Sequence, residues 1–299
     1  MRNLCAFFAS ALFAVPLVAQ VPAAVSADPA PDKLNPATME TMQIPSHGSL
    51  LNALMYEAAG TGPHGVVVLL HGFPGNEKNL DLAQAIRRDG WNVLYFNYRG
   101  SWGTPGAFSF AHSMEDTQAA IAYLRDPATT KKLRVDPAKI VLMGHSMGGM
   151  IAAYTAAHDT KILGVGLISA ADMAGYGTLP ADAPEEVKKQ MVARLAKGLA
   201  AEGMSPLAGC TPESLAAELM AHPEWALAND AAGLASTPIL IVTSDDGGAA
   251  PAEKLAAAIR AEGNREISEA HLATDHGYSD KRIELETTML GGLDYLSKR

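Results

Sequence analysis

Cysteine is nearly absent from this 299-residue chain, which contains only Cys5 and Cys210. Cys5 lies in an apolar N-terminal segment, so the rest of the chain has a single thiol and cannot form an internal disulfide. The same scarcity leaves no cysteine cluster that would bind zinc or an iron–sulfur centre. We therefore expect no structural disulfide, no metal, and no other cofactor.

Positive charge is also scarce. The chain has 23 Lys and Arg against 32 Asp and Glu, which gives a formal net charge of −9. The acidic residues are spread along the chain, and the sequence has no basic patch that would neutralise a phosphate backbone. Nucleic acid is therefore not an expected partner, and the oligomeric state is not indicated.

Long apolar runs are missing except at the N-terminus. Residues 4–18 are apolar, but Pro16 interrupts them and the run is shorter than a membrane span. Small residues follow it, as they do in secretory signal peptides. We predict a signal peptide over residues 1–27, cleaved after Ala19 or Ala27, a secreted or periplasmic protein, and no stable membrane span once the leader is removed. An uncleaved membrane anchor is the alternative.

The rest of the chain alternates short apolar runs with longer amphipathic segments, as βα units do. Most of the runs are rich in Val, Ile and Leu, which is typical of strands covered on both faces of a parallel sheet. The predicted strands are Met39–Ile44, Leu50–Glu57, Val66–Leu70, Trp91–Phe96, Ile140–Met143, Gly164–Ile168, Pro238–Thr243 and Glu266–Ala270. The first two suit a hairpin. We predict one α/β domain over residues 28–299, with a mostly parallel central sheet flanked by helices.

Two helices are predicted from local signals. After Phe110, Ser113 and Asp116 have the spacing of a capping box, so we expect a helix that begins there and ends before Asp126. A second helix is expected over Pro251–Arg260.

The stretch 172–234 interrupts the alternation. It contains the helical pieces Glu185–Glu202 and Pro212–Ala221 without a clear strand. Insertions at the carboxyl ends of strands lie over the ligand site of open α/β sheets, so we predict an inserted helical cap that selects the substrate. Helix ends or hinges would explain its glycines, Gly175, Gly177, Gly198 and Gly203.

The most specific motif is Gly144-His145-Ser146-Met147-Gly148, which joins a predicted strand to a predicted helix. A serine at such a turn has a strained backbone, and the two glycines remove side chains that would collide with the neighbouring strand and helix. The Ser146 hydroxyl is thereby exposed, as a nucleophile requires. A glycine-rich turn used only for close packing is the alternative.

The loop His71-Gly72-Phe73-Pro74-Gly75 follows the strand one βα unit earlier. The backbone N–H groups of Phe73 and Met147 are expected to form an oxyanion hole for a carbonyl under attack. A plain strand-to-helix turn is the alternative. His71 and His145 adjoin these loops and are expected to be structural supports.

A serine nucleophile needs a general base, and imidazole has a suitable pKa. His276 follows the last predicted strand, whereas His271 continues that strand and is expected to be packed or hydrogen-bonded. The acid that orients the imidazole is expected in the loop after the preceding strand, where Asp245 and Asp246 are adjacent. Either residue can serve, and the other is expected to cap a helix or turn.

Together these residues resemble the α/β-hydrolase family over nearly the whole chain. Asn97–Gly103 and Asp275–Asp280 look like segments of its prolyl-oligopeptidase-related and dienelactone-hydrolase-like branches. Pro251 resembles the proline that follows the acid in many of these enzymes, which favours Asp246 over Asp245. The loop around Tyr98-Arg99-Gly100 is expected to be a wall of the active-site mouth or a structural turn.

The resemblance implies a carboxylic-ester hydrolase that acts on a small-molecule substrate through an acyl-enzyme on Ser146. A serine at this turn, instead of an aspartate, disfavours the dehalogenase and epoxide-hydrolase relatives. The alternatives are a serine peptidase or amidase, which amide turnover would distinguish, and a non-catalytic ligand-binding homologue.

Overall fold

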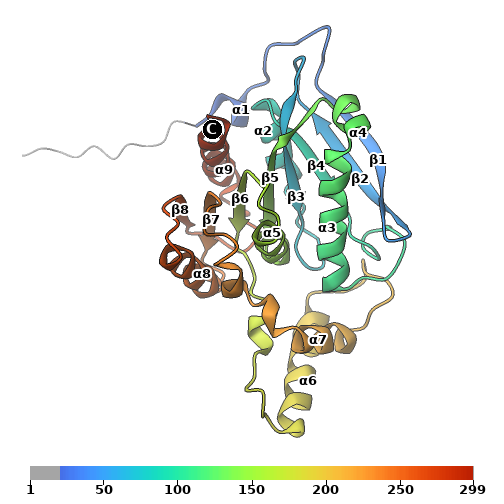
Figure 1. The fold of residues 1–299 in the computed structure, drawn as a ribbon, viewed down its shortest axis with the longest axis vertical. Helices are drawn as coiled ribbons and strands as arrows, with labels where there is room; N and C mark the ends of the chain where they lie inside the picture. The colour runs from blue at the N-terminus through green and yellow to red at the C-terminus, as the bar shows by residue number, and fades with distance from the viewer. Residues whose placement is uncertain (1–20, 299) are drawn as a thin grey trace, which may run out of the picture.

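The computed structural model describes residues 21–298. Its centre is an eight-stranded sheet with the order β1-β2-β4-β3-β5-β6-β7-β8 (Figure 1). The strands are β1 (Thr38–Ser46), β2 (Ser49–Glu57), β3 (His64–Leu70), β4 (Asn92–Phe96), β5 (Val135–His145), β6 (Gly164–Ile168), β7 (Ile239–Ser244) and β8 (Ile267–Leu272). β1 and β2 form an antiparallel hairpin and β2 is antiparallel to β4, while the remaining neighbours are parallel. The predicted strands and the mostly parallel sheet are confirmed.

Helices cover both faces of the sheet (Figure 1). The α-helices are α1 (Ala23–Ser26), α2 (Leu80–Arg88), α3 (Phe110–Arg125), α4 (Pro127–Lys132), α5 (Met147–Ala157), α6 (Glu185–Ala201), α7 (Pro212–Ala221), α8 (Ala249–Ala261) and α9 (Arg282–Ser297). Side chains of α1, α2 and α9 share one hydrophobic core, and those of α3, α5 and α8 belong to the other. Because both faces are covered, β4 and β6 are buried along their whole lengths.

The predicted start of α3 is wrong. The N-cap is Ser109, whose hydroxyl accepts a hydrogen bond from the backbone N–H of His112 at 3.0 Å. Ser113 and Asp116 lie inside the helix, where the Ser113 hydroxyl donates to the Ser109 carbonyl and Asp116 accepts from Arg99. Their spacing therefore reflects a local and a tertiary hydrogen bond instead of a capping box. The predicted end of the helix before Asp126 is confirmed.

Helices α6 and α7 project beyond the carboxyl ends of the parallel strands (Figure 1). Three short 3₁₀ segments complete the stretch, η1 (Gly175–Gly177), η2 (Pro223–Trp225) and η3 (Leu227–Asp230). The Glu218 carboxylate on α7 accepts hydrogen bonds from the backbone N–H groups of Phe110 and Ala111, at 3.0 and 2.9 Å. These N–H groups belong to the first turn of α3. Backbone N–H groups in the first turn of a helix have no acceptor within the helix. The contact fixes the inserted helices to the layer beside the sheet.

Part of the predicted signal peptide, residues 1–20, lies outside the described residues. The short helix α1 falls within its remainder and contacts α2 and α9. Arg88 of α2 donates a hydrogen bond to the Ala24 carbonyl at 2.5 Å. Between residues 21 and 298, no helix is long and apolar enough to cross a membrane.

Candidate active site

Ser146 occupies a sharp turn between β5 and α5. Its backbone angles are φ 57° and ψ −122°, a conformation that costs energy for a residue with a side chain. A Cβ on Gly144 would lie 2.0 Å from the Gly148 carbonyl oxygen, and a Cβ on Gly148 would lie 2.2 Å from the Leu70 carbonyl oxygen. The two glycines are therefore required by the close approach of strand, turn and helix.

The neighbouring strand β6 holds this turn in place. The Ser146 N–H donates to the Ile168 carbonyl at 2.9 Å, and the Ser146 carbonyl accepts from the Ala171 N–H at 3.0 Å. Within the described part of the chain, the Ser146 hydroxyl itself has no hydrogen-bond partner. The hydroxyl thus remains available to a ligand in the adjoining pocket.

His276 and Asp246 form a hydrogen-bonded pair in the same pocket as Ser146. His276 Nδ1 lies 2.6 Å from Asp246 Oδ2, with the Asp246 side chain 10% exposed and that of His276 47% exposed. Asp246 Oδ1 also accepts from the Gly248 N–H at 2.7 Å. Burial raises the pKa of Asp246, but the hydrogen bonds from His276 and Gly248 outweigh it and hold that pKa below its ordinary value. Asp246 is therefore a carboxylate at neutral pH and fixes the proton of His276 on Nδ1.

Asp245 meets a different histidine. Its Oδ1 accepts from His271 Nε2 at 3.0 Å, and His271 Nδ1 lies 2.9 Å from Thr243 Oγ1. Both members of this pair are exposed, and they do not line the pocket of Ser146. Helix α8 begins after Gly248 without a side-chain cap, so the expectation that the second aspartate caps a helix or turn is wrong. An exposed histidine on edge strand β8 binds that carboxylate instead.

His145 supports the loop that carries His276. It is buried, and its Nε2 donates to the His276 carbonyl at 2.8 Å. Burial and, to a smaller extent, the nearby His276 lower the pKa of His145 to about 4, so His145 is neutral at pH 7. Burial also lowers the pKa of His71 to about 4, and its Nδ1 donates to the Gly72 carbonyl at 2.8 Å. Both histidines bind backbone atoms, as their predicted supporting roles require.

The loop after β3 packs directly against the serine. A Cβ on Gly72 would lie 2.9 Å from the Ser146 Cβ, so only glycine permits this approach. The Trp102 indole N–H donates to the Pro74 carbonyl at 2.8 Å and steadies the other end of the loop. Among residues 21–298, the backbone N–H groups of Phe73 and Met147 have no hydrogen-bond acceptor. Two donors thus remain available beside Ser146, as an oxyanion hole requires.

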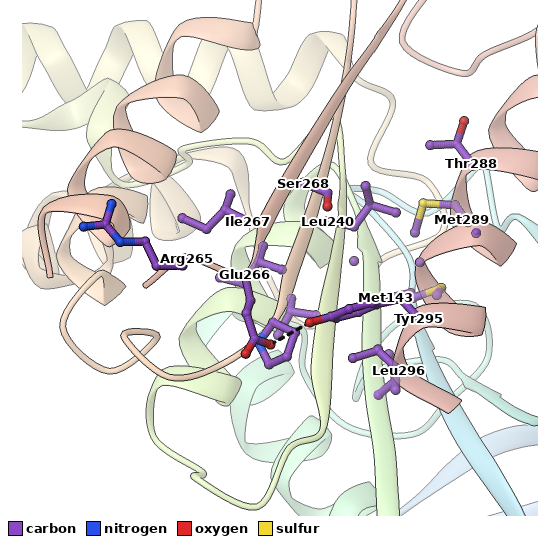
Figure 2. Close-up of a pocket in the computed structure, with 17 residues that line it drawn as sticks. Met143, Leu240, Arg265, Glu266, Ile267, Ser268, Thr288, Met289, Tyr295 and Leu296 are labelled. Atoms are coloured by element: carbon purple, nitrogen blue, oxygen red, sulfur yellow. Dashed lines mark hydrogen bonds between the residues drawn. The ribbon is translucent and has the colours of Figure 1, made fainter. Parts of the chain in front are cut away.

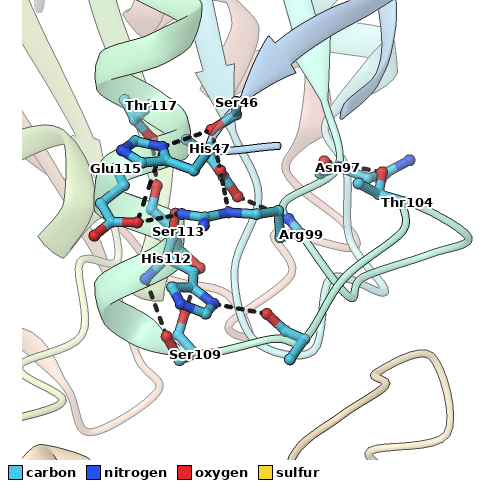
Figure 3. Close-up of polar contacts among 12 residues, drawn as sticks. Ser46, His47, Asn97, Arg99, Thr104, Ser109, His112, Ser113, Glu115 and Thr117 are labelled. Atoms are coloured by element: carbon cyan, nitrogen blue, oxygen red, sulfur yellow. Dashed lines mark hydrogen bonds and ion pairs between the residues drawn. The ribbon is translucent and has the colours of Figure 1, made fainter. Parts of the chain in front are cut away.

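The loop that contains Trp102 begins with a buried ion pair. Arg99 Nε lies 2.6 Å from Asp116 Oδ1, and the Arg99 N–H donates to Asp116 Oδ2 at 2.7 Å. Its guanidinium also pairs with Glu115, and the Ser46 hydroxyl donates to Asp116 at 2.6 Å (Figure 3). These contacts join the β1–β2 turn, the loop and α3. Arg99 does not line the pocket, which makes this segment a structural turn and not a wall of the mouth.

A hydrogen-bonded cluster behind the acid was not predicted. The Ser169 hydroxyl lies 2.9 Å from both the Ser244 hydroxyl and the Tyr278 hydroxyl, and it also bonds Asp246. The buried Tyr278 hydroxyl donates to the Val242 carbonyl at 3.2 Å. The cluster links the loops of Asp246 and His276 beneath the pocket. Ser169 follows β6 directly, and its place at the carboxyl end of a parallel strand is the signal that points to it.

The pocket has a volume of about 640 Å³ and two walls. The wall on the sheet side contains Phe73, Ser146, Ser169, Ala170, Ala171, Asp246, Gly247, Gly248 and His276. The opposite wall belongs to the inserted stretch and contains Met173, Tyr176, Arg194, Leu195, Gly198, Leu199, Glu202 and Leu219. The inserted helices therefore cover the serine, as predicted.

A second cavity of about 460 Å³ lies between α9 and strands β5 to β8 and shares no residue with the first (Figure 2). Its lining is largely apolar, and the Tyr295 hydroxyl donates to Glu266 Oε2 at 3.3 Å at one side. Ser146, His276 and Asp246 do not line it. In the described part of the chain, no group of three or more His, Cys, Asp or Glu residues is placed to bind a metal ion.

Comparison with known proteins agrees with this geometry. Residues 65–201 match the family model of the α/β-hydrolase fold. The quorum-quenching protein AidA of Acinetobacter baumannii is 30% identical over 130 residues, which are 42% of this chain and 41% of AidA. The chain spans between 32% and 41% of the length of the curated relatives it matches.

Two solved structures show the same fold at low sequence identity. A lipase in its open form has a TM-score of 0.65 and 18% identity, covering 88% of this chain and 100% of the lipase. The carboxylesterase EstE1, cloned from a metagenomic library, has a TM-score of 0.60 and 21% identity, covering 88% of this chain and 90% of EstE1. Together with the sheet order and the turn at Ser146, these comparisons show that the chain has the α/β-hydrolase fold.

Proposed function

We propose that this chain is a serine hydrolase that cleaves small-molecule carboxylic esters through an acyl-enzyme on Ser146. The observation that carries the proposal is a single pocket holding Ser146 on strained backbone together with the hydrogen-bonded His276–Asp246 pair. A serine hydroxyl is a weak nucleophile until a base takes its proton. The lipase and esterase folds named above support the ester as substrate.

In the first half-reaction, Ser146 Oγ attacks the ester carbonyl carbon while His276 Nε2 takes the hydroxyl proton. The carbonyl oxygen becomes negative and accepts hydrogen bonds from the N–H groups of Phe73 and Met147. Asp246 stabilises the imidazolium that forms. The carbon–oxygen bond to the alcohol then breaks, His276 returns its proton to the leaving oxygen, and the acyl group remains on Ser146.

In the second half-reaction, water replaces the alcohol. His276 takes a proton from the water as its oxygen attacks the acyl carbon, and the same two N–H groups stabilise the negative oxygen. The bond to Ser146 breaks, and the serine oxygen regains its proton from His276. The products are a carboxylic acid and an alcohol, so no external oxidant or reductant is needed.

The first experiment compares Ser146→Ala with the wild-type chain on p-nitrophenyl esters and aminoacyl p-nitroanilides. We expect ester turnover by the wild type and a loss of roughly three orders of magnitude or more in the variant, because the nucleophile is gone. Circular dichroism checks that the variant is folded. Ser268→Ala, at an exposed position of β8, is the control and should retain full activity.

Retention of more than a few per cent of ester turnover by folded Ser146→Ala would contradict the proposal. Turnover of the anilides but not of the esters would instead identify a peptidase or amidase.

A further inference from the structure

Helix α6 and its C-cap supply five of the residues that line the pocket opposite Ser146. They recur at helical spacing and so share one face of the helix. In chain order they are Arg194, Leu195, Gly198, Leu199 and Glu202. At about 1.5 Å per residue this face is about 12 Å long. The wall is thus long enough to lie beside an extended chain of atoms.

The middle of this wall is apolar and its ends are charged. Leu195 and the buried Leu199 lie in the middle, with the buried Leu219 of α7 also lining the pocket. Arg194 stands at one end and Glu202 at the other. An apolar chain laid beside the middle of α6 would contact these leucines.

Gly198 stands in the middle of this wall, and neither the backbone nor its neighbours require a glycine there. Its φ lies outside the left-handed region, and an added Cβ would meet no atom within 4 Å. Glycine is among the least favourable residues inside a helix. By contrast, Gly203 has a φ of +81° and follows the end of α6, which explains that glycine. Gly198 is exposed and lines the pocket, so a side chain at this position would have open space at the pocket wall.

We propose that Gly198 is a specificity-determining residue that keeps open an apolar channel along α6 for the acyl chain of a medium-chain carboxylic ester. The inference rests on the proposed ester hydrolysis. The acyl group is assigned to the channel because it stays on Ser146 through both half-reactions, whereas the alcohol leaves after the first. Apolar surface of the chain would be removed from water against Leu195 and Leu199.

The test replaces Gly198 by leucine in the full chain and compares kcat/KM for p-nitrophenyl octanoate and p-nitrophenyl acetate. We expect the octanoate-to-acetate ratio to fall at least about tenfold, since discrimination by apolar contacts reaches this size. Acetate turnover should stay within about threefold of the wild type. The melting temperature should stay equal or rise, because leucine favours a helix more than glycine does.

Gly291→Leu in α9 is the matched control. A Cβ there also meets no atom within 4 Å, and Gly291 does not line the pocket of Ser146. This variant should show a similar change in stability with an unchanged ratio. If Gly198→Leu does not fold, Gly198→Ala adds a single methyl group and should lower the ratio about twofold or more.

A ratio within the error of the wild-type value in folded Gly198 variants would overturn the inference, as would a parallel loss on both esters. Alkyl fluorophosphonates separate this result from a failure of ester hydrolysis. They form an oxygen–phosphorus bond to Ser146 as fluoride leaves, so labelling requires no ester turnover. If the wild type hydrolyses no ester, an octyl-to-methyl labelling ratio that falls in Gly198→Leu still supports the channel, and an unchanged ratio rejects it.

Discussion

Two adjacent aspartates have separate partners in this structure. Asp246 faces the pocket and binds His276, while Asp245 binds the exposed His271. Both residues lie in the bend that follows β7, where one step along the chain changes the partner. The chemistry of the site thus depends on which side chain is aimed at the imidazole and not on the presence of a carboxylate nearby.

This difference predicts unequal effects of two conservative substitutions. Asp246→Asn should lower kcat by roughly three to four orders of magnitude, because the amide no longer fixes the His276 tautomer or stabilises its cation. Asp245→Asn should lower kcat by less than about threefold, because an exposed pair contributes little. Steady-state kinetics on a p-nitrophenyl ester measures both. The opposite order of losses would transfer the orienting role to Asp245.

At the scale of elements, the inserted stretch is held over the pocket by a few polar contacts. Glu218 of α7 bonds the first turn of α3, and Asp172 Oδ1 accepts from the N–H groups of Gly175 and Leu227 at 3.0 and 2.9 Å. Asp172 thereby ties the start of the stretch to its end. These contacts place α6 and α7 in a defined position, which gives the pocket a second wall.

Removing the α7 contact should loosen the cap where it meets α3. Glu218→Ala is expected to lower the free energy of unfolding by about 1–2 kcal/mol, because two N–H groups and the positive end of a helix lose a carboxylate. Urea unfolding measures that loss. Hydrogen exchange should become faster at the amides of Phe110 and Ala111. Glu213→Ala, at an exposed position of the same helix, is the control, and equal exchange in both variants would disprove the role of Glu218.

At the scale of the whole molecule, buried titratable groups set opposing pH dependences of stability. Asp230 is 5% exposed, and its Oδ2 has no hydrogen-bond partner among the described residues. Burial and, to a smaller extent, the neighbouring Asp172 raise the pKa of Asp230 to about 7. Since the folded state then binds a proton that the unfolded state has released, stability falls as the pH rises from about 4 to 7. His71 and His145 have the opposite effect. Their pKa values are lower in the folded state than in the unfolded state, so stability falls as the pH falls below about 6.5.

Asp230→Asn should therefore stabilise the protein most at high pH. The variant should melt above the wild type at pH 8, by roughly 2–4 °C for each kcal/mol gained, and the difference should shrink at pH 5. Comparing the two proteins at each pH cancels the histidine contributions. Asp182→Asn, at an exposed position of the inserted stretch, should leave the melting temperature unchanged at both pH 5 and pH 8. An equal difference at pH 5 and pH 8 would show that the Asp230 proton is not linked to folding.

The sequence by itself determined the features that depend on neighbours along the chain. The short apolar runs indicated the strands, because strands covered on both faces must be apolar along their length. The glycines around Ser146 fixed the turn, because only residues without a Cβ fit between β3, β5 and α5. The chain order of Ser146, an aspartate and His276, each after a predicted strand, identified the candidate site, because parallel strands bring their carboxyl ends to one edge of the sheet.

The tertiary structure decided what depends on contacts between distant segments. Asp116 has the spacing of a helix cap, yet it binds Arg99, because the loop after β4 passes beside α3. Ser169 and Tyr278, 109 residues apart, meet only because β6, β7 and β8 lie side by side in the sheet and their carboxyl ends share one edge. Gly198 looks like a hinge or a helix end in the sequence. Only the position of α6 beside the pocket shows that Gly198 lines it and that an added Cβ would meet no atom within 4 Å, because these contacts depend on distant segments.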